Sequence, residues 1–275
     1  MYTDYFKLSA APFQLSPDPR FYFASSGHKK AMAYLTYGLS QGEGFIVVTG
    51  EVGSGKTTLI KRMLSDLDQE RYVVASVVTS RLGPAAALRA AAAAFGIDQA
   101  RLDKASLLRR IETFLVEHKR AGRKALLVVD EAQNIPFPAL EELRMLSNFQ
   151  AGDEALLQCL LLGQPQFRDM LSEERFEQLR QRVVASCHLM PLNQDETRAY
   201  IAHRLKVAGW AGDPDFSADA YAAIQDSTGG VPRRVNTLCS RLLLYGYLEE
   251  AHRIDGRIVE EVARELAREL GPAGG

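Results

Sequence analysis

Apolar runs alternate with amphipathic stretches through the first 190 residues of the chain. The runs with the length and composition of buried strands lie at 44–50, 71–80, 124–130, 155–163 and 184–190. Helical periodicity occupies stretches between them, at 56–67, 84–95, 104–119 and 137–149. Short buried strands that alternate with helices predict an α/β fold, in which a parallel sheet has helices on both faces.

The pattern changes after Pro191, where the periodic stretches are helical and none predicts a strand. These stretches cover 193–209, 217–228, 233–251 and 255–270. Ser217 and Asp255 stand at N-cap positions, where a short polar side chain can accept a free backbone N–H group. The last stretch places four apolar side chains on one face, which we expect to pack on the rest of the helical region: Ile258, Val262, Leu266 and Leu270. The sequence therefore predicts an α/β domain over 1–191, a small all-helical lid domain over 192–270 and a flexible tail over 271–275.

The composition is that of an ordinary soluble globular protein, with 47% hydrophobic and 24% charged residues. The 33 Lys and Arg residues balance 34 Asp and Glu residues, so net charge provides no overall attraction to nucleic acid or anionic lipid. Cys159, Cys187 and Cys239 are widely spaced, which favours a reducing cytoplasm over a disulfide framework or a zinc site. We expect no signal peptide and no membrane-spanning segment.

The segment GEVGSGKT at 50–57 matches the phosphate-binding pattern G-x-x-x-x-G-K-[ST], directly after a predicted strand and at the start of a predicted helix. Its glycines allow the backbone to curl, so that successive N–H groups point at phosphate oxygens beside the positive end of the helix. We expect Lys56 to reach the β- and γ-phosphates of ATP and the Thr57 hydroxyl to bind Mg²⁺. A glycine-rich turn without a ligand is the alternative. The predicted nucleotide-binding residues of this loop are Gly50, Glu51, Val52, Gly53, Ser54, Gly55, Lys56, Thr57 and Thr58.

Two adjacent carboxylates, Asp130 and Glu131, end the apolar run in LLVVDEAQN. A buried charge is costly unless something pairs with it. We expect the parallel sheet to place this strand beside the strand that enters the phosphate loop. Asp130 then holds the Mg²⁺ shell, and Glu131 polarises the water that attacks the γ-phosphate. An acidic pair that caps the following helix is the alternative.

The helical region after Pro191 separates two classes of nucleotide-driven protein. A DEAD-box helicase requires a second α/β domain, and the region 192–270 is too short and too helical to form one. A single α/β core followed by a small helical lid is the AAA+ arrangement, which the sequence therefore favours.

Further polar residues lie where an AAA+ arrangement uses them. Gln164 follows the fourth predicted strand, where its amide can sense the γ-phosphate; a simple strand-to-turn amide is the alternative. Arg180 and Arg182 precede the fifth strand, where an arginine finger reaches the nucleotide of a neighbouring subunit. Arg182 is preferred, and a surface salt bridge is the alternative. Pro232 suits the first position of a helix, so that Arg233 can swing onto the β- and γ-phosphates; an interdomain ion pair is the alternative.

These motifs together resemble the AAA+ ATPases of the general secretion pathway protein A type, most closely the ATPase encoded with exosortase/PEP-CTERM exopolysaccharide systems. The resemblance runs from Tyr5 to about residue 268. It is carried by YFKLSAAPFQLSPDPRFYFASSGHKKAMAYLTYGL (5–39), GEVGSGKTTL, LLVVDEAQN, LLLGQPQF, LRQRV and GGVPRRVN. The phosphate loop and the acidic pair occur in very many nucleotide hydrolases, whereas the N-terminal block and LLGQP…LRQRV are much more specific.

The resemblance implies that residues 5–39 surround the adenine, within an adenine-side segment over 1–43 of the AAA+ domain. Phe13, Pro17 and Tyr22 lie near the base in this arrangement, and His28 opens the next helix; core packing of these aromatic side chains is the alternative. Secretion-pathway members often continue into a membrane segment and a peptidoglycan-binding domain. This sequence stops near the end of the lid, so we expect any envelope role to pass through a protein partner.

The sequence therefore predicts a cytoplasmic Mg²⁺-dependent ATPase, held at the inner membrane at most through a partner. We expect it to form a ring or helical homo-oligomer, because an arginine finger is useful only in trans. Its output is expected to be mechanical or regulatory work for an envelope secretion or exopolysaccharide-assembly system. A DNA-associated regulator of the transposition target-selection type is the main alternative, with the basic loop KRAGRK at 119–124 as its candidate phosphate contact. A nucleotide-binding scaffold that hardly turns over is a third.

Overall fold

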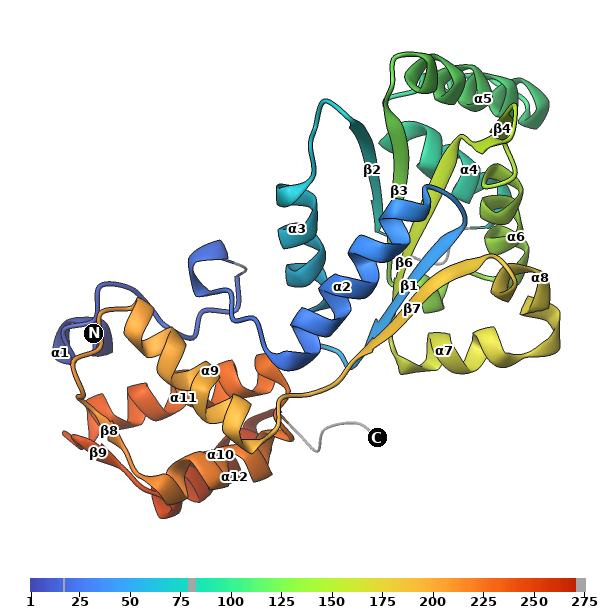
Figure 1. The fold of residues 1–275 in the computed structure, drawn as a ribbon. Helices are drawn as coiled ribbons and strands as arrows, with labels where there is room; N and C mark the ends of the chain where they lie inside the picture. The colour runs from blue at the N-terminus through green and yellow to red at the C-terminus, as the bar shows by residue number, and fades with distance from the viewer. Residues whose placement is uncertain (17, 79–82, 271–275) are drawn as a thin grey trace. The chain divides into compact units, whose positions relative to one another are not determined.

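The computed structural model describes residues 1–16, 18–78 and 83–270 of the chain, which divide into two compact units (Figure 1). The sheet unit comprises residues 29–50 and 59–189. The helical unit comprises the described parts of 1–28, 51–58 and 190–275. The chain leaves the sheet unit after residue 189, and the predicted domain bounds of 1–191 and 192–270 stay predictions. Residues 1–28 and the phosphate loop group with the helical region, so each unit is built from segments distant in sequence.

Five parallel strands form the central sheet in the order β2-β3-β6-β1-β7. The strands are β1 Phe45–Gly50, β2 Tyr72–Val78, β3 Lys124–Asp130, β6 Leu157–Gly163 and β7 Val183–Leu189. This confirms the predicted α/β fold, although Thr79 and Ser80, which the prediction included in the second strand, lie outside the described residues.

The order of the strands corrects one prediction. β6 pairs with β1 on one side and with β3 on the other, so the strand that ends at Asp130 does not lie directly beside β1. Every residue of β6 is buried, and a strand that is buried throughout is best placed between two neighbours. The nonlocal packing of this strand decides the order, which the succession of strands along the chain does not reveal.

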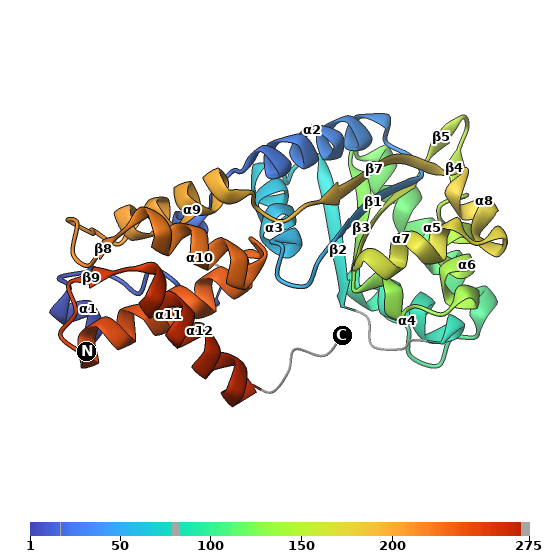
Figure 2. The same cartoon turned by 90° about the horizontal axis from the view of Figure 1, so that it is seen from below.

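Helices cover both faces of the sheet (Figures 1 and 2). On one face lie α2 Ser26–Gln41 and α3 Lys56–Asp66, both of which begin in the helical unit and continue into the sheet unit. Leu35 and Leu59 from these helices pack with Ile46 and Val128 from the strands. The other face is covered by α4 Pro84–Ala94, α5 Lys104–Arg120, α6 Phe137–Leu146, α7 Pro165–Ser172 and α8 Glu177–Arg180. The three central strands β1, β3 and β6 are thereby buried between two apolar layers, whereas the edge strands β2 and β7 are partly exposed.

Several short elements of the structure have no counterpart in the sequence prediction. They are α1 Tyr2–Tyr5, the 3₁₀ turns Pro19–Phe21, Ala132–Asn134 and Glu174–Phe176, and the antiparallel pair β4 Gln150–Ala151 and β5 Glu154–Ala155, together with α7 and α8. Elements of two to eight residues contain too few positions to establish a hydrophobic period, so pattern alone does not identify them.

The helical unit contains the four predicted helices, which are α9 Gln194–Val207, α10 Ala218–Thr228, α11 Pro232–Leu248 and α12 Gly256–Leu270. The expectation of no strand after Pro191 is wrong, because β8 Asp215–Phe216 and β9 Arg253–Ile254 pair in parallel. This pair is too short to show alternation, and it places Phe216 and Ile254 in the core of the unit.

The predicted ends of two of these helices agree with the structure in different ways. Asp255 accepts a hydrogen bond from the N–H of Ile258 at 2.9 Å, which confirms it as an N-cap. Ser217 is the N-cap residue of α10, but its hydroxyl donates to the carbonyl of Ile254 instead of accepting from the helix. On α12, Ile258 and Val262 are buried and Leu266 is half-buried, while the side chain of Leu270 lies outside the description.

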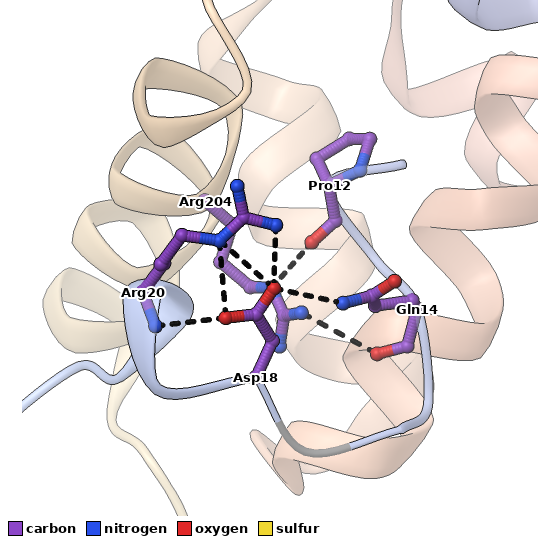
Figure 3. Close-up of polar contacts among 5 residues, drawn as sticks. All are labelled: Pro12, Gln14, Asp18, Arg20 and Arg204. Atoms are coloured by element: carbon purple, nitrogen blue, oxygen red, sulfur yellow. Dashed lines mark hydrogen bonds and ion pairs between the residues drawn. The ribbon is translucent and has the colours of Figure 1, made fainter. Parts of the chain in front are cut away.

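A buried arginine anchors the N-terminal segment to the helical unit (Figure 3). Arg204 of α9 is 7% exposed, and its guanidinium donates to the carbonyl of Pro12 and, at 2.8 Å, to the hydroxyl of Tyr200. It also lies 5.0 Å from the centre of the Phe21 ring, within the range of a cation–π interaction. Carbonyl acceptors and aromatic faces thus compensate the burial of this cation.

The three cysteines are free thiols. Cys159 and Cys239 are buried and Cys187 is half-buried. Burial raises the pKa of Cys159 to about 12, that of Cys187 to about 11, and that of Cys239 further. Within the described parts of the chain, no helix has both the length and the apolar character that a bilayer crossing requires.

Candidate functional site

The phosphate loop joins β1, which ends at Gly50, to α3, which begins at Lys56. Gly53 and Gly55 have φ angles of +83° and +98°, which residues with a β-carbon rarely adopt. A β-carbon on Gly53 would lie 2.4 Å from the β-carbon of Arg233, so the loop has no room for one. The local sequence therefore fixes a curled backbone at the start of a helix, as the motif predicts.

The polar groups of this loop fit an anionic ligand. Ser54 is 1% exposed, and its hydroxyl oxygen has no hydrogen-bond partner within the described residues. Lys56 is also buried, and its ammonium group donates to the carbonyl of Glu51 at 2.9 Å. A buried hydroxyl without a partner is rare in folded proteins, and a bound phosphate oxygen would provide one here. Thr57 is exposed and Thr58 half-buried at the first turn of α3.

His28 of α2 lies against the same loop. A β-carbon on Gly55 would be 2.8 Å from Nε2 of His28, and the other ring nitrogen is 2.7 Å from the hydroxyl of Ser25. Burial lowers the pKa of His28, against the opposite effect of the Glu196 carboxylate. Tyr22 packs edge-on against the imidazole ring, so the aromatic side chain predicted near adenine lies next to a residue that touches the loop.

Phe13, the other aromatic side chain predicted near adenine, lies in the core of the helical unit and is 2% exposed. Its packing agrees with the alternative role that the sequence left open, and its contact with a base stays a prediction. Pro17 lies outside the described residues.

The acidic pair stands at the end of β3. The carboxylate of Asp130 accepts the backbone N–H of Glu131 at 2.9 Å, and Glu131 has a φ angle of +56°. This left-handed conformation is uncommon for a residue with a side chain, and such conformations concentrate at functional sites. The turn directs the chain from the strand into the 3₁₀ segment Ala132–Asn134.

Two amides hold the Glu131 carboxylate. Gln164 donates from its side chain to Oε2 of Glu131 at 3.1 Å, and Gln133 donates a short hydrogen bond to the same oxygen. The backbone N–H of Gln164 in turn donates to the side-chain oxygen of Gln133 at 3.0 Å. Gln164 follows β6, and its role as a γ-phosphate sensor stays a prediction, whereas Gln133 is a residue that sequence reasoning missed. The only feature of the sequence that could have indicated Gln133 is a polar amide two positions after Glu131.

Three neighbouring strands of the sheet end at the same edge. β1, β6 and β3 are parallel neighbours, so their carboxyl ends, at Gly50, Gly163 and Asp130, lie at the same edge. The phosphate loop follows Gly50, Gln164 follows Gly163, and Glu131 follows Asp130. Ligand sites of open parallel sheets lie at this edge.

Arg233 stands at the start of α11, one position after Pro232. Its backbone N–H donates to the carbonyl of Gly53 at 3.2 Å, so this helix begins against the phosphate loop. The side chain is exposed, and within the described residues its guanidinium forms no hydrogen bond or ion pair.

The two candidate finger arginines differ in their contacts. The guanidinium of Arg180 donates to the carbonyl of Leu171 at 2.8 Å and to that of Glu173 at 3.4 Å. Arg182 is half-buried before β7, whereas Arg180 is exposed. The carbonyl of Arg182 accepts the N–H of Phe45, and its guanidinium has no hydrogen bond or ion pair among the described residues. Because the Arg180 guanidinium is engaged within its own chain, the contacts favour Arg182 as the finger, although Arg180 is the more exposed residue.

The basic loop at 119–124 is partly neutralised within the chain. Lys119 forms an ion pair with Glu154, and the guanidinium of Arg123 donates to the carbonyls of Gln69 and Tyr72. These contacts reduce the number of cations that the loop presents to a polyanion.

Comparisons with known proteins agree with this geometry. A family model described as an AAA domain matches residues 39–171. The chain is 37% identical over 258 residues to general secretion pathway protein A of Aeromonas hydrophila, which covers 92% of this chain and 46% of that protein. The chain thus spans about half the length of this curated relative.

Solved structures share the fold at low sequence identity. The ORC2 protein of Aeropyrum pernix, determined in ADPNP–ADP complexes, has a TM-score of 0.68 at 16% identity, covering 97% of this chain and 75% of that one. The RuvB branch migration motor of Thermotoga maritima has a TM-score of 0.55 at 21% identity, covering 87% of this chain and 68% of that one. These likenesses establish the AAA+ fold of the chain.

Proposed function

We propose that the chain, an AAA+ protein related to general secretion pathway protein A, binds ATP and hydrolyses it with Mg²⁺. The observation that carries this proposal is the phosphate loop, where positive-φ glycines and a buried hydroxyl that has no hydrogen-bond partner in the described part of the chain surround the start of a helix. Oriented N–H groups at a helix start favour a multiply charged anion. The related fold of the ORC2 protein, solved in ADPNP–ADP complexes, supports a nucleotide as that anion.

The roles of the surrounding residues follow from their chemistry. Thr57 and Asp130 carry the hard oxygen ligands that Mg²⁺ prefers, and the bound ion would neutralise charge on the phosphate oxygens. Glu131 orients the attacking water and accepts its proton. Gln164 and Arg233 bind the terminal phosphates, and Arg182 completes the site of a neighbouring copy. Phe13 and Tyr22 belong to the segment proposed to lie near the base.

We expect the purified chain to release phosphate from ATP in the presence of Mg²⁺, and the Lys56→Ala variant to lose this activity. Lys56 contributes charge-assisted hydrogen bonds to the phosphates, and their loss should weaken ATP binding about 10- to 100-fold. Isothermal titration with ADP and ATP measures binding, and phosphate release measures turnover. Lys61→Ala is the matched control, because Lys61 is an exposed lysine of the same helix. A wild-type chain that neither retains ATP nor releases phosphate contradicts the proposal.

The process that this ATPase serves is proposed from its relative. We infer that the chain acts as a motor or switch for an envelope secretion system, with the exosortase/PEP-CTERM exopolysaccharide system as the specific candidate. The 37% identity to general secretion pathway protein A supports the secretion role. We further propose that it works in the cytoplasm as a homo-oligomer and reaches the envelope through a protein partner.

Capture of partners tests this assignment. The Glu131→Gln variant, loaded with Mg²⁺ and ATP, should retain components of an envelope-assembly system from a detergent extract of the source cells. The Lys56→Ala variant should retain much less of them, because its weaker ATP binding leaves fewer molecules in the ATP-bound state. Retention of duplex DNA together with recombination proteins, lost at raised salt, would instead favour the DNA-associated alternative.

A further inference from the structure

The side-chain amide of Gln133 links two parts of the candidate site. Its nitrogen donates to Oε2 of Glu131, and its oxygen accepts the backbone N–H of Gln164 at 3.0 Å. The orientation of the amide follows from chemistry, because the N–H of Gln164 can only donate and must face the oxygen. The amide nitrogen is then directed at the carboxylate. We propose that Gln133 is a positioning residue that holds the Glu131 carboxylate in place for hydrolysis, an inference that rests on the ATPase function proposed above.

The arrangement around Glu131 explains why a second amide is needed. Gln133 and Gln164 both donate to the same oxygen of Glu131, Oε2. When the Gln164 side chain turns to a terminal phosphate, as its proposed role requires, it leaves Oε2. Gln133 then remains as the donor that keeps the carboxylate from rotating, and the position of the general base is preserved while phosphate is sensed.

Gln133 also connects Glu131 to the end of β6. Gln164 is the N-cap residue of α7, so its N–H lies outside the hydrogen bonding of that helix and is available to Gln133. A displacement of the β6–α7 junction therefore moves the Gln133 amide and, through it, the carboxylate. The backbone of Glu131 is already in the left-handed conformation, which leaves the side-chain contacts to fix the direction of its carboxylate.

Two variants of Gln133 separate this positioning from simple space filling. Gln133→Met keeps the length of the side chain and removes both hydrogen bonds. Gln133→Glu keeps an acceptor for the N–H of Gln164 but presents a carboxylate to Glu131. We expect each to lower kcat for ATP hydrolysis about tenfold or more, with KM and the ATP dissociation constant unchanged within about twofold, because only the general base loses its orientation. Asn134→Leu is the matched control, since Asn134 is the next residue, is exposed and has no side-chain hydrogen bond within the described chain.

The Glu131→Gln background provides the decisive comparison. If Gln133 acts through Glu131, then Gln133→Met should lower the residual phosphate release of Glu131→Gln no further, because effects on one functional unit are not additive. Three results overturn the inference. The first is a full kcat in both Gln133 variants, and the second is a change confined to KM. The third is a fall of kcat on adding Gln133→Met to Glu131→Gln that is as large as the fall in the wild-type chain. The wild-type chain, assayed alongside, separates the two proposals: its failure to hydrolyse ATP refutes the function, whereas normal wild-type hydrolysis with active Gln133 variants refutes only the role of Gln133.

Discussion

Replacing Glu131 by Gln is expected to lower the rate of ATP hydrolysis by about 10²–10⁴-fold, because the general base is lost. ATP should stay bound with nearly unchanged affinity, since the phosphate loop and the Mg²⁺ ligands proposed for it are intact. Single-turnover phosphate release measures the chemical step, and equilibrium binding of a fluorescent ATP analogue measures affinity. Glu112→Gln is the control, because Glu112 is an exposed carboxylate of α5 without an ion pair in the described residues.

The same variant should change the assembly of the protein. An ATP that is bound but not consumed keeps the arginine finger of the next copy engaged, so oligomers should persist in light scattering or sedimentation. Unchanged turnover in Glu131→Gln would remove Glu131 from the reaction and leave the acidic pair as a cap of the following 3₁₀ segment. Equal loss of binding and turnover would show that Glu131 supports the fold of the loop instead of the chemistry.

The Arg182→Ala variant is expected to lose about 10³-fold or more in turnover at protein concentrations that permit self-association, the range found for arginine fingers. The nucleotide affinity of the isolated chain should stay the same, because the finger contributes to the site of a neighbouring copy. Arg180→Ala should have a much smaller effect on the rate, since that guanidinium is bonded to the carbonyls of Leu171 and Glu173 in its own chain. Steady-state hydrolysis across a dilution series measures both.

Mixing two inactive variants tests whether the finger acts in trans. Arg182→Ala carries an intact Glu131, and Glu131→Gln carries an intact Arg182, so a mixed oligomer contains some complete sites. Activity in the mixture that exceeds both separate variants supports the proposed interface. A mixture no more active than its parts, from variants that still co-assemble, contradicts it and leaves Arg182 as a surface residue.

Short stretches of sequence predict most of the local chemistry of the candidate site. Gly53 and Gly55 in GEVGSGKT predict a curled loop, because few other residues adopt positive φ angles, and the structure has them at +83° and +98°. The apolar run that ends at Asp130 predicts a buried strand with a carboxylate at its end, and β3 ends there. Both features depend on residues next to one another in the chain, whose conformational preferences act before any tertiary contact forms.

Periodicity along the chain likewise predicted most of the longer helices and strands, because side-chain direction repeats with a fixed period within one element, but it did not predict α2. Nor did it predict β8 and β9, whose two-residue strands are too short to show a period. Periodicity also did not distinguish the contacts of Arg180 from those of Arg182, since both residues lie in one polar segment. Only the folded chain shows that the carbonyls of Leu171 and Glu173 engage the first.

Only the tertiary structure decided which segments distant in sequence are in contact. It placed β6 between β1 and β3, the amide of Gln133 between Glu131 and Gln164, the start of α11 against Gly53, and residues 1–28 with the helical unit. Such contacts depend on which apolar faces pack together over the whole chain, and many pairings are compatible with the same local pattern. The sequence by itself thus determined the loop and the acidic pair, while packing decided which other side chains meet them.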